Sequence, residues 1–144
     1  MALRAVHPYT ATDPASGITA DSLRAWREHR RLFSTFVRAD LAAPTGQAGP
    51  AYADSGSGPV HPTLVLTDAE GRCLALNGTP GGFCGEGPRG AATILAAEGL
   101  LPDHDALATV VTARAGATFT RALPRVIDLR DTHRTEMRDA DETR

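Results

Sequence analysis

The first regular feature of the chain is a helical pattern of apolar residues. At about 100° per residue, the large apolar side chains between residues 20 and 41 collect on one broad face. They are Leu23, Trp26, Phe33, Phe36, Val37 and Leu41. This spacing predicts an amphipathic helix from about residue 20 to residue 41, with Trp26 and the two phenylalanines anchoring the core.

A strand pattern follows. The runs TLVLTD and RCLALNG are rich in β-forming and apolar residues, and the short segment AEG separates them. Gly71 can adopt the left-handed conformation that such a turn requires. We therefore predict a β-hairpin centred on residues 69–71.

A second helix is predicted to begin at Pro88, after the loop TPGGFCGEG. Pro88 suits the first helical position, and Gly99 suits the position just past the helix end. Leu95 and Leu100 are spaced for the apolar contact that accompanies a glycine-terminated helix.

Two more β-rich runs, LATVVTA and ATFTRAL, predict a second hairpin, and RVIDL predicts a further strand. The expected fold class is α+β. It has an antiparallel sheet of four to five strands packed with two main helices, in the order α-β-β-α-β-β, with RVIDL as a final strand where five are present.

The length of 144 residues fits one domain. We expect an irregular arm over residues 1–18, a single domain over 19–130 and a disordered charged tail over 131–144. The segment 42–61 is rich in Gly, Pro and Ser, which is typical of a mobile flap or a linker.

Composition narrows the classes of function. All 15 basic residues are arginine, a bias typical of a GC-rich genome, and the formal net charge is −2. That charge gives no overall attraction for nucleic acid or for an anionic membrane. The chain shows no apolar segment long enough to cross a membrane, and it has only two cysteines, so we expect a cytoplasmic protein with reduced thiols and no membrane partner.

The strongest candidate for a ligand contact is the glycine-rich loop before the second predicted helix. Gly85, Gly87 and Gly90 have the spacing of a dinucleotide-binding motif, and Arg89 adds a positive charge at a helix N-terminus. A hairpin precedes this loop, however, where a Rossmann site requires a βαβ unit. The motif therefore predicts an anion or small-molecule contact without identifying a cofactor, and a simple turn of the chain is the alternative.

Cys84 is the candidate nucleophile, because a position just before a helix lowers the pKa of a thiol. His104 is the nearest histidine in the following sequence and the candidate base. The five histidines show no metal-binding spacing, so no metal site is predicted.

Arginines form a ridge along the flank of the first predicted helix. They are Arg24, Arg27, Arg31 and Arg38. Arginine suits bidentate contacts with phosphate, so the ridge is a candidate surface for nucleic acid or for an acidic protein, and a solvated helix face is the alternative.

The segment VLTDAEGRCLAL resembles the central hairpin of GAF and PAS sensor domains, and GEGPRGAATILAAEG resembles the glycine-led helix of GAF domains. This resemblance implies an antiparallel sheet flanked by helices, with a ligand or protein pocket under the glycine loop. A profilin-like or roadblock-like layout has a similar order of elements and would imply protein–protein contact.

These observations favour a non-catalytic binding or regulatory domain that contacts a small molecule or a protein partner through loop 79–90. The alternatives are a small enzyme that uses Cys84 and a nucleic-acid-binding domain that uses the arginine ridge. The small number of aromatic residues also raises the hypothesis of a homodimer through the first helix.

Overall fold

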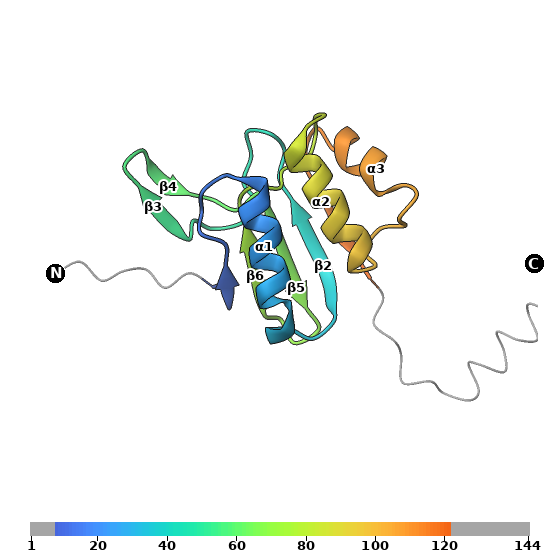
Figure 1. Ribbon diagram of the computed structural model, residues 1–144, viewed down its shortest axis with the longest axis horizontal. Coiled ribbons are helices and arrows are strands. Elements are labelled where there is room, and N and C mark those ends of the chain that lie inside the picture. The colour runs from blue at the N-terminus through green and yellow to red at the C-terminus, as the bar shows by residue number, and fades with distance from the viewer. Residues whose placement is uncertain (1–7, 122–144) are drawn as a thin grey trace, which may run out of the picture.

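The protein is an α+β fold built on a mixed five-stranded sheet, with α1 and α2 covering one face of the sheet and α3 packed against α2 (Figure 1). The computed structural model describes residues 8–121. The strand order is β1-β6-β5-β2-β7, and the sheet is mixed because β1 runs parallel to β6 while the other pairs are antiparallel. In chain order the elements are β1 (Ala11–Thr12), α1 (Thr19–His29), the 3₁₀ turn η1 (Arg30–Leu32), β2 (Phe36–Leu41), β3 (Ala53–Ser55), β4 (Gly58–Val60), β5 (Leu64–Asp68), β6 (Cys73–Leu76), α2 (Glu86–Ala97), α3 (Ala106–Thr112) and β7 (Ala117–Thr120).

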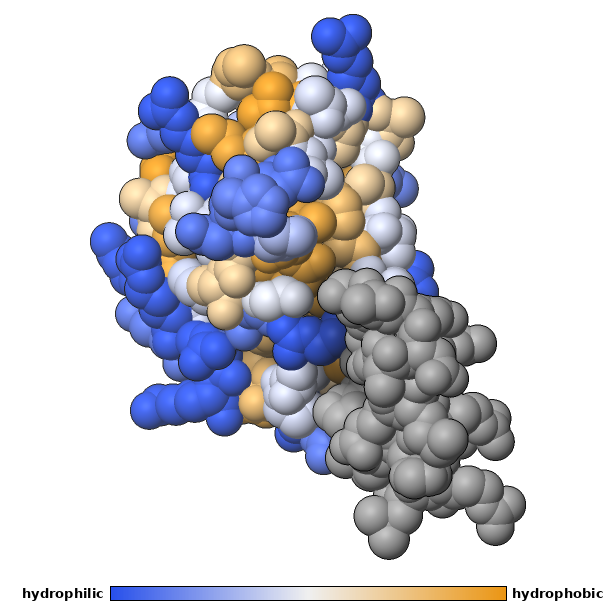
Figure 2. Space-filling view, turned by 90° about the vertical axis from the view of Figure 1, so that its right-hand side faces the viewer, coloured by the Kyte–Doolittle hydropathy of each residue, from blue (hydrophilic) through white to orange (hydrophobic). Residues whose placement is uncertain are grey.

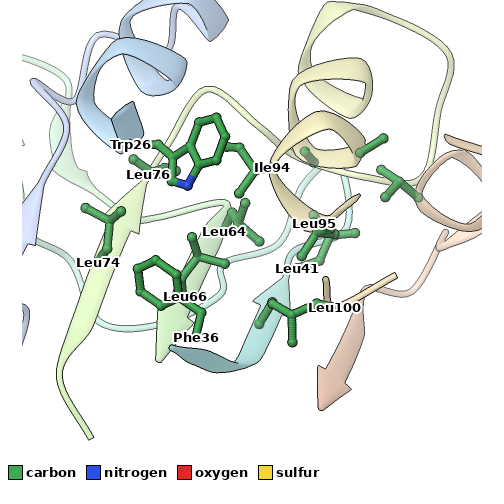
Figure 3. Close-up of a cluster of buried hydrophobic side chains, with 14 of the residues drawn as sticks. Trp26, Phe36, Leu41, Leu64, Leu66, Leu74, Leu76, Ile94, Leu95 and Leu100 are labelled. Carbon is green, nitrogen blue, oxygen red and sulfur yellow. The ribbon is translucent and has the colours of Figure 1, made fainter. Parts of the chain in front are cut away.

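The core lies between the helices and the sheet (Figure 3). Trp26 of α1 and Ile94 and Leu95 of α2 pack onto leucines of the central strands. Complete burial of each such side chain contributes on the order of 1.5–3 kcal/mol. The strand residues that complete this layer are Phe36, Leu41, Leu64, Leu66, Leu74 and Leu76.

The opposite face of the sheet is covered in part. Tyr9 and Tyr52 form a small cluster with Val65 of β5 and Ala75 of β6. Alternate residues of a strand point to opposite faces, so on β2 the core-facing Ala39 leaves Arg38 on this outer face, where Arg38 is exposed.

The predicted first hairpin is confirmed. β5 and β6 pair antiparallel with Leu66 opposite Leu74, and Gly71 in the turn has φ +84°. The predicted end of the second helix is also confirmed. Gly99 has φ +74°, and the backbone N–H of Leu100 donates to the carbonyl of Leu95 over 2.9 Å, as a glycine-terminated helix requires.

The second helix begins at Glu86, two residues before the predicted start, so Pro88 occupies the third helical position. Proline is accommodated there because the first N–H groups of a helix have no partner within the helix.

The prediction of one helix from residue 20 to residue 41 is wrong at its C-terminal half. α1 ends at His29, η1 follows, and residues 36–41 form β2, which pairs with β5 on one side and β7 on the other. The backbone N–H of Ser34 donates to the Asp68 carboxylate over 2.9 Å, and the carbonyl of Thr35 accepts from the N–H of Ala69. These contacts with the β5–β6 turn replace helical hydrogen bonds, and the β-branched and aromatic residues at 35–37 favour the strand.

The predicted strand LATVVTA is wrong, because this segment forms α3. Ala106 and Val110, four residues apart, are both buried, and each of Thr109 and Thr112 donates its hydroxyl to the carbonyl four residues before it. The packing of one small helical face against α2 therefore outweighs the β preference of the threonines and valines. The predicted strand at ATFT exists as β7, but it pairs with β2 instead of with LATVVTA.

The order of elements consequently differs from the predicted one, although the α+β class is confirmed. The segment 42–61 contains the β3–β4 hairpin, and the N-terminal arm contributes β1. The predicted strand RVIDL and the predicted charged tail lie outside the described residues. Within residues 8–121, no helix has the length and apolar character needed to cross a membrane.

Candidate functional site

Loop 79–90, as the sequence predicted it, comprises the end of the connection from β6 and the start of α2, and its glycines bring backbone segments close together. A Cβ atom on Gly90 would lie 2.6 Å from Cγ2 of Thr19 on α1, and one on Gly87 would lie 2.6 Å from Cδ of Pro80. Both glycines are buried. The spacing that suggested a ligand motif therefore serves, at Gly87 and Gly90, to pack the start of α2 against α1 and against its own loop.

The exposed side of the loop carries the remaining candidates. Gly85 is the N-cap of α2, and no side chain among the described residues caps this helix end. Phe83 is 41% exposed, and Arg89 in the first turn of α2 is exposed with no carboxylate of the described chain within ion-pair distance. The start of α2 is thus open to solvent at Phe83 and Arg89.

An open groove of about 720 Å³ adjoins this helix start. We call it the α2/α3 groove. Its walls are the outer face of α2 on one side, and the 98–105 connection with the first turn of α3 on the other. Four alanines line it, namely Ala92, Ala96, Ala97 and Ala106.

Larger and charged side chains stand at the margin of the α2/α3 groove. Arg89 and Thr93 come from α2, Asp103 comes from the connection, and Leu107 comes from α3, where its side chain is 47% exposed. Within residues 8–121, neither Arg89 nor Asp103 has an ion-pair partner. Figure 2 looks at the side of the molecule on which α3 lies and shows apolar and hydrophilic residues interspersed there.

Cys84 and His104 are not joined by a hydrogen bond. Cys84 is an exposed free thiol just before α2, whereas His104 is exposed in the connection that follows the same helix. In the described part of the chain no base contacts the Cys84 sulfur. Among the described residues, the structure therefore does not pair Cys84 with the base that the sequence suggested, and the start of α2 is the feature that lies beside the thiol.

The predicted arginine ridge is divided between two faces of the molecule, because the helix that would have carried all four arginines ends at residue 29. Arg24 and Arg27 lie on α1 and Arg31 lies on η1, but Arg38 lies on β2 and points to the outer face of the sheet. A hydrogen bond and the negative charge of Asp40, 3.0 Å away, raise the pKa of Arg38. Arg38 therefore cannot contribute to a continuous basic surface along α1.

Other charges near α1 are also neutralised. Glu98 at the end of α2 accepts hydrogen bonds from Trp26 Nε1 at 2.7 Å and from Arg30 Nη2 at 3.0 Å. Arg24 lies 3.9 Å from Asp21. Arg27 and Arg31 are the members of the predicted ridge that stay exposed without such a partner in the described residues.

A buried polar cluster surrounds Asp13, and the sequence did not predict it. The Asp13 carboxylate accepts hydrogen bonds from the Ser22 hydroxyl at 2.6 Å, from the Asn77 N–H at 2.8 Å and from the Tyr52 hydroxyl. Burial and the hydrogen bond to Asp13 raise the pKa of Tyr52, and burial raises the pKa of Tyr9 to about 12. This cluster holds the N-terminal arm and the 42–61 segment onto the sheet, so 42–61 is attached to the domain at its middle.

The described residues contain no group of three or more His, Cys, Asp or Glu side chains that could hold a metal ion. The groove residue Leu107 was not predicted as a site because LATVVTA was interpreted as a strand. A signal was present: Ala106 and Val110 have helical spacing, and Asp105 precedes them at a position that favours a helix start.

Comparison of the chain with protein-family models, with curated protein sequences and with solved structures finds no match.

Proposed function

We propose that this chain is a non-catalytic binding domain that contacts a protein partner through loop 79–90 and the adjoining α2/α3 groove. The observation that carries the proposal is the groove itself. It combines an alanine-lined interior, a half-exposed leucine and two unpaired charges of opposite sign beside an uncapped helix start.

A protein partner fits these features better than a small molecule does. Small-molecule sites are concave and bury most of the ligand surface, whereas the α2/α3 groove is open along its length. Exposed apolar anchors such as Leu107, with charged residues around them, are typical of surfaces that bind proteins.

The resemblance of the β5–β6 hairpin and of the start of α2 to GAF and PAS sensor domains supports a regulatory role. The alternative of an enzyme that uses Cys84 has less support, because no described base lies at the thiol. Arg89, which the sequence predicted as a contact residue, lines the same groove as Asp103 and Leu107, so binding at the groove would give it that role.

The test is selection of binding peptides from a random library displayed on phage, with the full chain as the target. We expect peptides that bind the wild type to lose affinity for Leu107→Asp by about tenfold or more, because a charge would be placed on the apolar margin of the groove. Leu32→Asp is the matched control, since Leu32 on η1 is also 47% exposed but lies outside the groove. A library that yields no binders, or binders equally sensitive to both variants, would contradict the proposal.

A further inference from the structure

We infer that the partner at the α2/α3 groove is a second copy of this chain, bound by a two-fold axis. This inference rests on the proposed function, because it identifies the protein that the groove binds. The groove carries both members of each proposed contact, an exposed leucine with an alanine-lined surface and a positive charge with a negative one.

The first argument concerns shape. The groove is lined by small side chains, and a large apolar side chain, Leu107, stands half-exposed at its margin. In a two-fold interface both copies use the same surface, so each contact between one residue and another occurs twice, once in each direction. Leu107 of each copy can therefore enter the alanine-lined groove of the other, and both exposed leucines become buried.

The second argument concerns charge. Arg89 on the α2 wall and Asp103 on the opposite wall have opposite signs, and neither has an ion-pair partner within the described residues. A two-fold axis that passes between these positions sets Arg89 of each copy against Asp103 of the other. The interface then contains two equivalent ion pairs, whereas a partner with charge of one sign would satisfy only one wall.

These contacts place the expected dimer on a different surface from α1. A two-fold axis at α1 would bring Arg27 and Arg31, which have no ion-pair partner in the described residues, toward the same residues of the other copy. Like charges that face each other destabilise an interface. The groove surface avoids this repulsion because Arg89 and Asp103 have opposite charges, and each can face the other across the two-fold axis.

Sedimentation velocity of the full chain over a concentration series up to about 1 mM tests the inference. Even a dimer with a dissociation constant of about 1 mM is populated at that concentration. We expect the wild type to shift from monomer to dimer. Each single reversal, Arg89→Asp or Asp103→Arg, should raise the dissociation constant about tenfold, since it converts two attractions into two repulsions. The double reversal should return the dissociation constant to within about threefold of the wild type.

Asp54→Arg is the control, because Asp54 is an exposed carboxylate on β3 that does not line the groove. It should leave the dissociation constant close to that of the wild type, and circular dichroism should show that every variant folds. A chain that stays monomeric at all concentrations overturns the inference, as does a dimer that the double reversal fails to restore or that Leu107→Asp leaves intact. A monomer that still binds phage peptides sensitive to Leu107→Asp would leave the proposed function standing and assign the groove to a different protein.

Discussion

Single residues in this molecule show how buried charge is made favourable. Burial of the Asp68 carboxyl by itself raises its pKa. Hydrogen bonds from the backbone N–H groups of Ser34, Arg72 and Glu70, together with the Arg72 guanidinium at 3.0 Å, outweigh burial and hold the pKa of Asp68 below its usual range. The carboxylate thereby joins the turn after β5 to the chain that enters β2, and it ends the helical segment before β2.

Acid should therefore destabilise the fold through Asp68. A carboxyl whose pKa is lowered in the folded state stabilises the protein above its unfolded pKa of about 4, and this stabilisation is lost as the pH falls through the lower folded value. We expect Asp68→Asn to reduce the free energy of unfolding at neutral pH by about 2 kcal/mol and to make it less dependent on pH below about 4. Urea unfolding followed by Trp26 fluorescence at a series of pH values measures both effects. An equal pH dependence in the wild type and the variant would contradict this account.

At the scale of elements, periodicity identified most segments but not always their type. The β5–β6 hairpin and α2 were predictable because turn glycines bound them, and Gly71 and Gly99 adopt the left-handed conformations that the sequence indicated. Segments without such marks were misassigned. Residues 36–41 fit both a helical and a strand pattern, and pairing with β5 and β7, which are distant in sequence, fixes them as a strand.

The site was predictable to the same extent. Arg89 and the loop at 79–90 follow from a local pattern, whereas the groove depends on α3, whose short amphipathic face is recognisable only once α2 is in place. The role of Gly90 also depends on a neighbour far along the chain, because Thr19 on α1 supplies the surface that excludes a side chain there.

Alanine substitutions at Gly90 and Gly85 test which of these two glycines the packing of α2 requires. Gly90→Ala should lower the free energy of unfolding by about 1–3 kcal/mol, because its Cβ would overlap Thr19 and force α1 and α2 apart. Gly85→Ala should change stability little. Gly85 has an extended backbone, and the nearest atom to its Cβ, at 3.0 Å, belongs to the ring of the exposed Phe83, which can move. Thermal unfolding of the two variants provides the measurement, and equal destabilisation would contradict the packing role.

For the whole molecule, the distribution of charge argues against a nucleic-acid interface. The arginines that seemed to form one ridge lie on two faces, and two of them, Arg24 and Arg38, pair with Asp21 and Asp40. The formal net charge of −2 adds no overall attraction for phosphate.

We expect no retention of the full chain on a heparin column at low salt, and no change in elution when Arg27 and Arg31 are both replaced by Glu. A basic surface that binds phosphates would give retention that falls steeply with salt and that the double variant abolishes. That result would restore the nucleic-acid hypothesis.

The hydrogen bonds of Asp13 bear on the order in which the fold assembles. They connect Asp13 to partners 9, 39 and 64 positions away along the chain, at Ser22, Tyr52 and Asn77. Closing such long loops costs conformational entropy before any bond forms, so this carboxylate can engage all three partners only after β5, β6 and α1 have brought them together. Its hydrogen bonds therefore form late in folding, and they slow the unfolding of the native domain more than they accelerate its folding.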